Sequence, residues 1–393
     1  MRNRRLWATL FLTLLIPAGM ATAQPAPTNS PAPAAAPAEA ASAGPAISDA
    51  TRAATGELND SQKAEVDAFV KSCAGKLLAG GGVKTIQAIR GAMLDASTRG
   101  PGAGFLRYFA TSATANFAPN TLKSKDVLVQ VNAALALASI SHPAMSPVLR
   151  QMAVDANAGV RYCGMKACRD LRPSLLTSTD TTGIDAILTL LQDRGRVETS
   201  PAVLGLIFQA MDFAPKGALA NTNAALLTGP QNRSRAIVAA SLAAHLQGVR
   251  DGDGGMSGAY AEAVKTIESI TGGVPDAEKT KVLQALAEVL ANAGEAYQEL
   301  SSQKGATAPD ELAGLLRATE GALGRLTGKG EAAVGKALDG MAPRGVAVKL
   351  AVNGWVGNAT SPGILNAAPF NVKPPVVLKA GKIAMATPAP AAR

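Results

Sequence analysis

The clearest pattern in the chain is a helical spacing of apolar residues between positions 158 and 171. When Val160 marks one side of a helical wheel, Gly164, Ala167 and Leu171 fall within about 40° of it. The other side carries larger or polar side chains, which are those of Tyr162, Met165, Lys166 and Arg169. The pattern predicts an amphipathic helix that buries its small residues and Leu171 in a core.

The same spacing returns in segments that begin at Val129, Val203 and Val282. Shorter apolar segments lie between the first three copies, at 147–154 and at 184–191. Helix, turn and helix therefore alternate with a period of about 30–45 residues, which is typical of a stacked helical array. In the first of these copies we expect Leu137 to lie in the core.

Helical patterns also flank this region. They cover 57–78, 83–94, 235–246, 260–270, 276–297 and 310–326, with Gly-rich turns between several of them. The sequence thus predicts an all-α chain in which antiparallel helix pairs stack as an α-solenoid. The helical-repeat domain is expected at 58–370, with its clearest repeats at 120–215.

One segment resembles a known family. Residues 155–171 resemble the second helix of a HEAT repeat, and the matching positions are Asp155, Val160, Arg161, Ala167 and Leu171. The copy at Val129 matches the apolar positions but has Gln130 where the family has Arg. The resemblance implies that Asp155 and Arg161 pair between neighbouring repeats, and that the second helices line a concave, partner-binding surface.

On such a surface, Tyr162, Lys166 and Arg169 are the candidate binding residues, because they lie opposite the buried side of their helix. The alternative reading of these three side chains is a solvated basic face that binds nothing. The hypothesis for function is a non-catalytic scaffold that binds a protein partner.

The ends of the chain differ from its middle. Residues 1–23 combine three arginines, an apolar core at 6–16 and the small-residue site Ala21-Thr22-Ala23, which predicts a secretory signal peptide. An uncleaved membrane anchor is the alternative. Residues 24–57 are rich in Pro and Ala and are expected to form a disordered linker, and 371–393 a disordered tail.

Export is therefore predicted, to a periplasmic or extracellular location, with no transmembrane segment once the signal is removed. The 393 residues contain 38 Lys and Arg against 29 Asp and Glu, a formal charge of +9. Loss of the three signal-peptide arginines would leave an excess of positive charge. An alternative partner is thus an anionic envelope polymer or a lipid headgroup surface. Nucleic acid is disfavoured by export.

Motifs for catalysis are weak. The two histidines, His142 and His245, lie far apart and without metal-ligand spacing, and no cofactor motif is present. A hydrolase with a carboxylate pair stays a less favoured alternative, because such a pair needs only spatial proximity. The Gly-rich stretch 251–262 matches a calcium loop incompletely, since Met256 occupies the position of the required glycine.

The three cysteines form an odd set. Cys163 and Cys168 lie on one predicted helix at a separation of about 8–9 Å, which is too far for a disulfide. Both are expected to be buried thiols. A bridge from Cys73 to one of them is the alternative.

Overall fold

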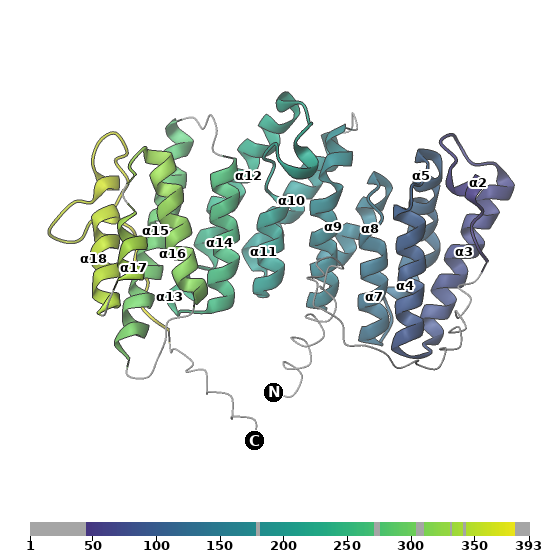
Figure 1. Ribbon diagram of the computed structural model, residues 1–393, viewed down its shortest axis with the longest axis horizontal. Helices are drawn as coiled ribbons and strands as arrows, with labels where there is room; N and C mark the ends of the chain where they lie inside the picture. Colours follow the sequence, from purple (N-terminus) through teal and green to yellow (C-terminus); the bar gives the residue numbers. More distant parts are fainter. Residues whose placement is uncertain are drawn as a thin grey trace, which may run out of the picture. The chain divides into compact units, whose positions relative to one another are not determined.

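The computed structural model describes residues 45–177, 181–270, 276–303, 310–330, 332–340 and 343–381. The signal peptide predicted at 1–23 lies outside these residues, as does the linker up to residue 44. Within the described part the regular structure is helical and includes no strand (Figure 1). The prediction of an all-α chain is confirmed.

The helices of the described residues differ greatly in length. The first half of the described chain contains α2 (Asp49–Arg52), α3 (Asp60–Ala79), α4 (Gly82–Thr98), α5 (Ala103–Ser112), α6 (Ala118–Thr121), α7 (Val127–Ala138), α8 (Ser146–Ala153), α9 (Ala158–Thr177) and α10 (Thr181–Val197). The second half contains α11 (Pro201–Ala210), α12 (Ala224–Ala244), α13 (Leu246–Arg250), α14 (Gly254–Ser269), α15 (Asp276–Ser302), α16 (Asp310–Thr327), α17 (Ala333–Asp339) and α18 (Arg344–Val356).

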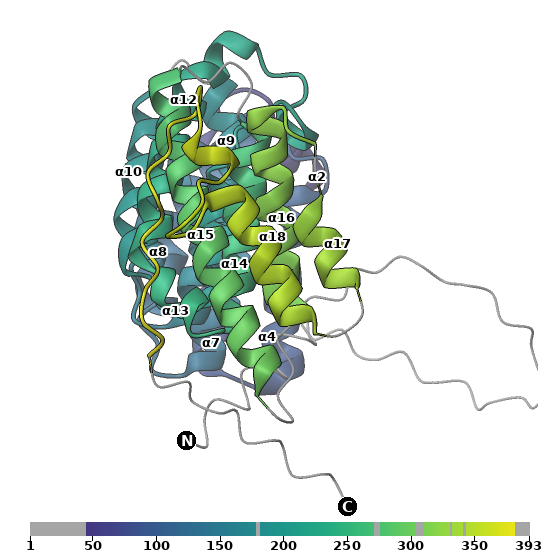
Figure 2. The same cartoon turned by 90° about the vertical axis from the view of Figure 1, so that its left-hand side faces the viewer.

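The helices pack in two series, which we call the front series and the back series. In the front series α4 contacts α7, and the contacts continue through α9, α11 and α14 to α16. In the back series α8 contacts α10, and the contacts continue through α12 and α15 to α18. Figure 2 shows α8, α10 and α12 toward one side and α16 toward the other. Contacts between the two series join α8 to α9, α10 to α11 and α15 to α16.

One of the predicted repeat copies belongs to the other series. The copies at Val129, Val160 and Val203 lie on α7, α9 and α11 of the front series, whereas the copy at Val282 lies on α15 of the back series. An apolar period of 3.6 residues shows that a helix has a buried face. It does not distinguish the two helices of a pair, because both bury such a face.

Local sequence explains where several helices start. Asn59 and Gln62 form a reciprocal capping box at the start of α3. The Asp126 carboxylate accepts the Leu128 N–H at 2.8 Å, and Asp253 accepts the Met256 N–H at 3.1 Å. These side chains satisfy amide groups that have no partner inside the helix.

The sequence patterns did not predict α5, α17 or α18. In α5 the two largest buried side chains are aromatic, and Phe105 and Phe109 lie with ring centroids 5.4 Å apart. Phe69 of α3 packs against the same cluster in a tilted arrangement, with its centroid 6.3 Å from that of Phe109. A short helix held by tertiary packing gives little periodic signal in the sequence.

The ordered part is longer at both ends than the composition indicated. Residues 45–57, predicted as linker, include α2, where Ser48 caps the Thr51 N–H at 3.2 Å. Of residues 371–381, predicted as the start of a disordered tail, 372–381 form an ordered extended segment. This segment begins at buried Val372 and lies along α15 and α13. We call residues 372–381 the strap.

Candidate functional site

The α9 helix positions the three binding residues that the sequence singled out. Asx turns start it: Asp155 Oδ1 accepts the Asn157 N–H at 2.7 Å, and Asn157 Oδ1 accepts the Gly159 N–H at 2.9 Å. Its core side is buried through Val160 and Leu171. The opposite face of the helix, which carries Tyr162, Lys166 and Arg169, therefore points away from this buried side.

Gly164 lets α9 approach α8 closely. A Cβ atom at this position would lie 2.8 Å from the Ala153 nitrogen and 3.0 Å from the Met152 Cβ. The small residue predicted on the buried side is therefore required by close packing of the two helices.

Met165 is a correction to the sequence analysis. The helical wheel places it on the side of Tyr162, opposite the core, whereas its side chain is fully buried. The reason is that α9 is covered from several directions, since it contacts α7, α8, α10 and α11. Tyr162 is half-buried, and this burial raises the pKa of its hydroxyl.

Lys166 and Arg169 both pair with Asp170. Lys166 Nζ lies 2.7 Å from Asp170 Oδ2, and Arg169 Nε lies 2.9 Å from Asp170 Oδ1. Burial by itself raises the pKa of Asp170, but the hydrogen bonds from the two cations outweigh it and hold the pKa below its ordinary value. The two predicted binding residues are thus already oriented by a carboxylate on their own helix.

The pairing continues across the next two helices of the front series. Arg169 Nη1 donates to Gln209 Oε1 on α11 at 2.9 Å. Gln209 Nε2 donates to Glu262 Oε2 on α14 at 3.1 Å, and Lys265 Nζ donates to Glu262 Oε1 at 2.7 Å. We call this chain of side chains the polar ladder; its members are Lys166, Arg169, Asp170, Gln209, Glu262 and Lys265.

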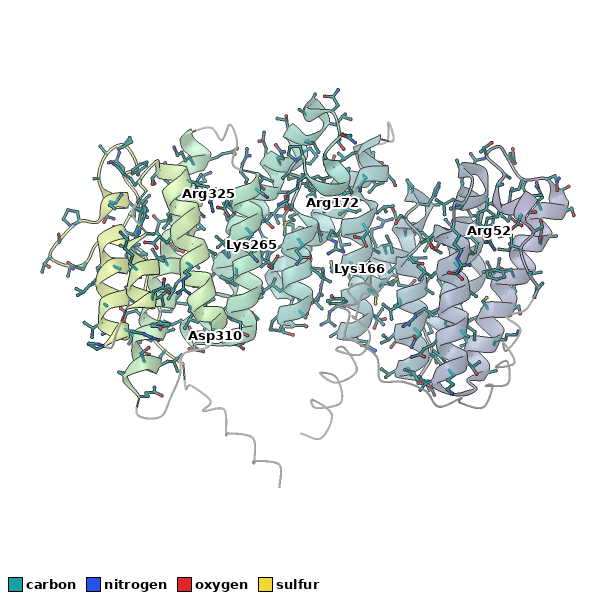
Figure 3. All side chains as sticks on the ribbon, in the orientation of Figure 1. Arg52, Lys166, Arg172, Lys265, Asp310 and Arg325 are labelled. Carbon is teal, nitrogen blue, oxygen red and sulfur yellow. The ribbon has the colours of Figure 1, made fainter. Side chains whose placement is uncertain are left out.

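A separate ion pair joins Arg325 of α16 to Glu268 of α14. Figure 3 labels Lys166, Lys265 and Arg325 on three helices of the front series. Their amino and guanidinium groups keep substantial exposure. The front series therefore presents charged groups of both signs on α9, α14 and α16, with the neutral Gln209 of α11 between the first two.

A small pocket of about 190 Å³ opens at the C-terminal end of α9, lined in part by Arg169, Arg172, Asp212 and Lys216. The Arg172 guanidinium stacks over the Phe213 ring at 5.3 Å and donates to the Arg169 carbonyl at 2.9 Å. Burial lowers the pKa of Arg172 to about 10. The group is held in place by packing and does not swing freely.

Asp212 connects this pocket to α14. Its Oδ1 accepts the Ser269 hydroxyl at 2.7 Å, and its Oδ2 lies 2.6 Å from Lys216 Nζ. The cations around the pocket are therefore partly neutralised by the Asp212 carboxylate. This lowers the attraction of the pocket for a free anion.

Arg161 has a structural role, but its charged partner differs from the one that the resemblance implied. It donates two hydrogen bonds to Glu198 at the end of α10, at 2.8 and 2.7 Å. Toward Asp155 it bonds only the main-chain carbonyl, at 2.9 Å. Glu198 also accepts from Arg194 at 2.7 Å and from the Ser200 N–H at 2.9 Å. The group joins α9 to the turn between α10 and α11.

The cysteines Cys73, Cys163 and Cys168 are free, buried thiols in the structure. Burial raises the pKa of each to about 12, so that the nucleophilic thiolate is scarce at neutral pH.

Other candidate chemistry is absorbed by the fold. In the loop compared with a calcium site, Asp253 caps α14 and Glu262 belongs to the polar ladder. The buried carboxylate of Glu320 accepts the Val334 N–H at 2.7 Å and the Trp355 Nε1–H at 3.0 Å. Within the described ranges, no three side chains of His, Cys, Asp or Glu group as metal ligands.

Of the six ladder residues, sequence reasoning identified only Lys166 and Arg169 as binding candidates. Asp170 follows Lys166 by four residues and could have been identified as its helical partner. Gln209 and Glu262 had no local signal, because each meets its partner through helix packing at a separation of 40 or 53 residues.

No protein-family model matches the chain, and the search of curated proteins found no match either. None of the helices among the described residues is long and apolar enough to cross a bilayer.

Proposed function

We propose that the protein is an exported, non-catalytic scaffold that binds a protein partner on the polar ladder. In this proposal the helix pairs form an α-solenoid of the HEAT-like type. The two continuous series of helix contacts support the stacked arrangement, and stacking explains how helices of such unequal length share one core. The unequal repeats, the Val282 copy in the back series and the Glu198 partner of Arg161 are its departures from a regular array.

The polar ladder is the observation that carries the proposal. Its charged groups come from separate helices and are fixed by mutual hydrogen bonds, so a partner finds them preorganised. Alternating signs suit a protein surface with complementary charges, which gains specificity from pairing each group. Exposed edges such as Lys265 Nζ leave donors available at the surface.

Binding of an anionic polymer or lipid headgroup is the second candidate. It is favoured by Arg169, Arg172 and Lys216 around one pocket. Asp170 and Asp212 line the same pocket, however, and pair with these cations or their neighbours. This local neutralisation is the reason for ranking a protein partner first.

The test is affinity capture from a cell-envelope extract, with the chain from Gln24 onward as bait. We compare the parent with a Lys166→Glu/Arg169→Glu variant, at low and high salt. The matched control is Lys84→Glu/Lys123→Glu, which makes the same change in net charge at exposed positions away from the ladder.

The proposal expects a specific protein that the parent and the control retain and the ladder variant loses. Equal loss in both variants, together with loss at high salt, would indicate charge-driven binding and move the anionic polymer to first place. Equal retention by all three would contradict the ladder as the binding surface. Export is tested separately, by intact mass of the protein from the envelope fraction, which should start at Gln24.

A further inference from the structure

The strap is bound through its main chain by one buried side chain of α15. Asn292 Nδ2 donates to the Val376 carbonyl at 2.9 Å, and Asn292 Oδ1 accepts the Leu378 N–H at 2.9 Å. The Asn292 side chain is fully buried, and its amide also donates to the Glu288 carbonyl at 2.8 Å. It therefore binds residues i and i+2 of an extended chain as a neighbouring strand would.

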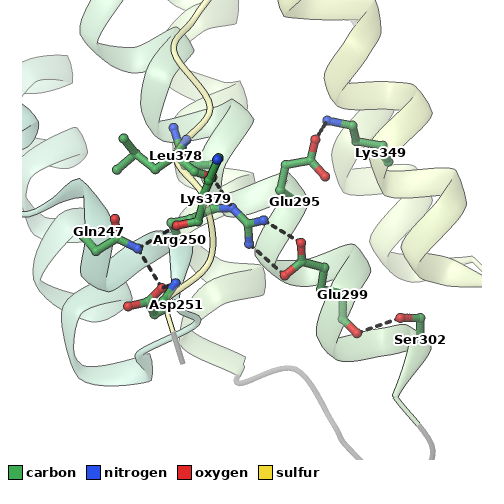
Figure 4. Close-up of polar contacts among 11 residues, drawn as sticks. Gln247, Arg250, Asp251, Glu295, Glu299, Ser302, Lys349, Leu378 and Lys379 are labelled. Carbon is green, nitrogen blue, oxygen red and sulfur yellow. Dashed lines mark hydrogen bonds and ion pairs between the residues drawn. The ribbon is translucent and has the colours of Figure 1, made fainter. Parts of the chain in front are cut away.

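Two side chains of α13 bind the next part of the strap (Figure 4). Arg250 Nε donates to the Leu378 carbonyl at 2.9 Å, and Gln247 Nε2 donates to the Lys379 carbonyl at 3.0 Å. Arg250 is itself held by Glu299, which accepts from both terminal nitrogens at 2.9 and 2.5 Å. Gln247 Nε2 also donates to Asp251 Oδ1 at 2.8 Å, so both donors are oriented by carboxylates of the protein.

Main-chain contacts also hold both ends of the strap. The Lys373 N–H donates to Gln284 Oε1 at 3.1 Å, and the Gly381 N–H donates to Asp251 Oδ1 at 2.7 Å. We call the set of receiving side chains the strap groove; its members are Gln247, Arg250, Asp251, Gln284 and Asn292.

The side chains of the strap contribute little to this binding. Val376 is 63% exposed and Val377 is 42% exposed, although both are large and apolar. After Val372, the strap residues are exposed or half-buried. The contact therefore depends on main-chain hydrogen bonds, and each of these is worth little net against water. Such a segment is held in place but can be exchanged.

We propose that the strap groove is a binding site for extended peptide backbone, filled by the chain's own strap and able to take the strap of a second copy. The second copy is the occupant because its strap is identical to the segment that these five side chains hold in the structure. The site lies on the back series and on α13, so it is separate from the polar ladder and does not depend on the proposed function.

The chain's own strap and a free strap peptide compete for the same groove. A tethered strap acts at an effective concentration on the order of mM, so it excludes a free peptide of equal intrinsic affinity. Weakening the tethered strap, without altering the groove, should open the site. Leu378→Pro does this, because proline lacks the N–H that Asn292 accepts and is compatible with an extended chain.

The experiment uses the full chain and a fluorescent peptide with the sequence of residues 372–381, followed by fluorescence anisotropy. We expect the peptide to bind the Leu378→Pro chain at least about tenfold more tightly than the parent chain. Hydrogen–deuterium exchange should rise in the strap of Leu378→Pro and stay unchanged in α15. Failure of the peptide to bind this variant, equal binding to both chains, or an unchanged strap would each overturn the proposal.

Two controls locate the binding. Asn292→Asp, added to Leu378→Pro, keeps an acceptor but removes the donor to the Val376 carbonyl, and should weaken binding about tenfold without opening a cavity. A peptide N-methylated at the leucine should bind about tenfold more weakly to Leu378→Pro, whereas a peptide with threonine at both exposed valines should bind equally well. Unchanged affinity of the Asn292→Asp/Leu378→Pro chain for the peptide, or of Leu378→Pro for the N-methylated peptide, would show that the groove does not bind the main chain.

Discussion

Removal of the Glu198 charge tests whether the buried ion pair holds the array together. Glu198 is 0% exposed and joins Arg161 of α9 to Arg194 of α10. The Glu198→Gln substitution keeps the size of the side chain and leaves an acceptor for the Ser200 N–H. It removes the negative charge that balances two guanidinium groups.

The magnitude follows from what those groups retain. Leaving a buried charge without its partner destabilises a protein by about 3–5 kcal/mol. Arg161 keeps its bonds to the Asp155 and Ala156 carbonyls, both at 2.9 Å, and Arg194 keeps 20% of its side-chain exposure. We therefore expect the lower end of the range, a loss of about 3 kcal/mol in the free energy of unfolding at neutral pH.

The pH dependence gives the prediction a second readout. Burial raises the pKa of Glu198, but the bonds from Arg161, Arg194 and the Ser200 N–H outweigh it and hold the pKa below 4.5. A carboxyl whose pKa is lower in the folded state adds stability above its unfolded pKa and loses it as pH falls through the folded pKa. The difference in the free energy of unfolding between the parent and Glu198→Gln should thus be constant well above the unfolded pKa of this carboxyl. It should shrink as the pH falls below 4.5.

Urea unfolding followed by far-UV circular dichroism measures this difference at several pH values. Asp185→Asn is the matched control, because Asp185 pairs with Arg233 at 2.8 Å on the surface and is 68% exposed. We expect a clearly smaller change in the control. A loss below about 1 kcal/mol for Glu198→Gln, or a difference independent of pH, would refute the reasoning.

Three further predictions concern the core and the thiols. Leu137→Ala should lower the free energy of unfolding by about 2–5 kcal/mol, because the Leu137 side chain is fully buried. A loss under about 0.5 kcal/mol in urea unfolding would contradict its place in the core. Gly164→Ala should destabilise by about 1–3 kcal/mol in the same assay, since the added methyl group would force α8 and α9 apart. Cys73, Cys163 and Cys168 should react with a thiol reagent only after unfolding, because their pKa values lie near 12; rapid colour development with the native chain would contradict their burial.

Helices that bury a single face could be predicted from the spacing of their apolar residues. On α9 the wheel identified the buried positions of Val160 and Leu171 and the partly exposed position of Lys166. It misplaced Met165, because contacts with α7, α8, α10 and α11 cover more of α9 than one face. The amount of cover depends on neighbours far along the chain, and a local period carries no information about them.

The ladder and the strap were hidden for a related reason. Gln209 reads as an ordinary polar residue at the end of an apolar helix, and its role appears only when α9 and α14 pack beside it. The strap is rich in Pro and Val with little to bury, which is why its composition indicated disorder. Its order comes from donors and acceptors on other helices. One signal was present in the sequence: Asn292 stands between two alanines at a buried position of α15, where an unpaired amide would be costly.

Two surfaces on different helices allow the two proposals to be separated experimentally. The ladder belongs to α9, α11 and α14, whereas the strap groove belongs to α13, the residue that follows it, and α15. Changes at independent sites add in free energy, and coupled sites deviate from the sum. Leu378→Pro should therefore leave capture of a ladder partner unchanged, and Lys166→Glu/Arg169→Glu should leave strap exchange unchanged. If instead release of the strap alters partner capture, the stacked helices transmit the change from the back series to the front series, and the strap regulates the scaffold.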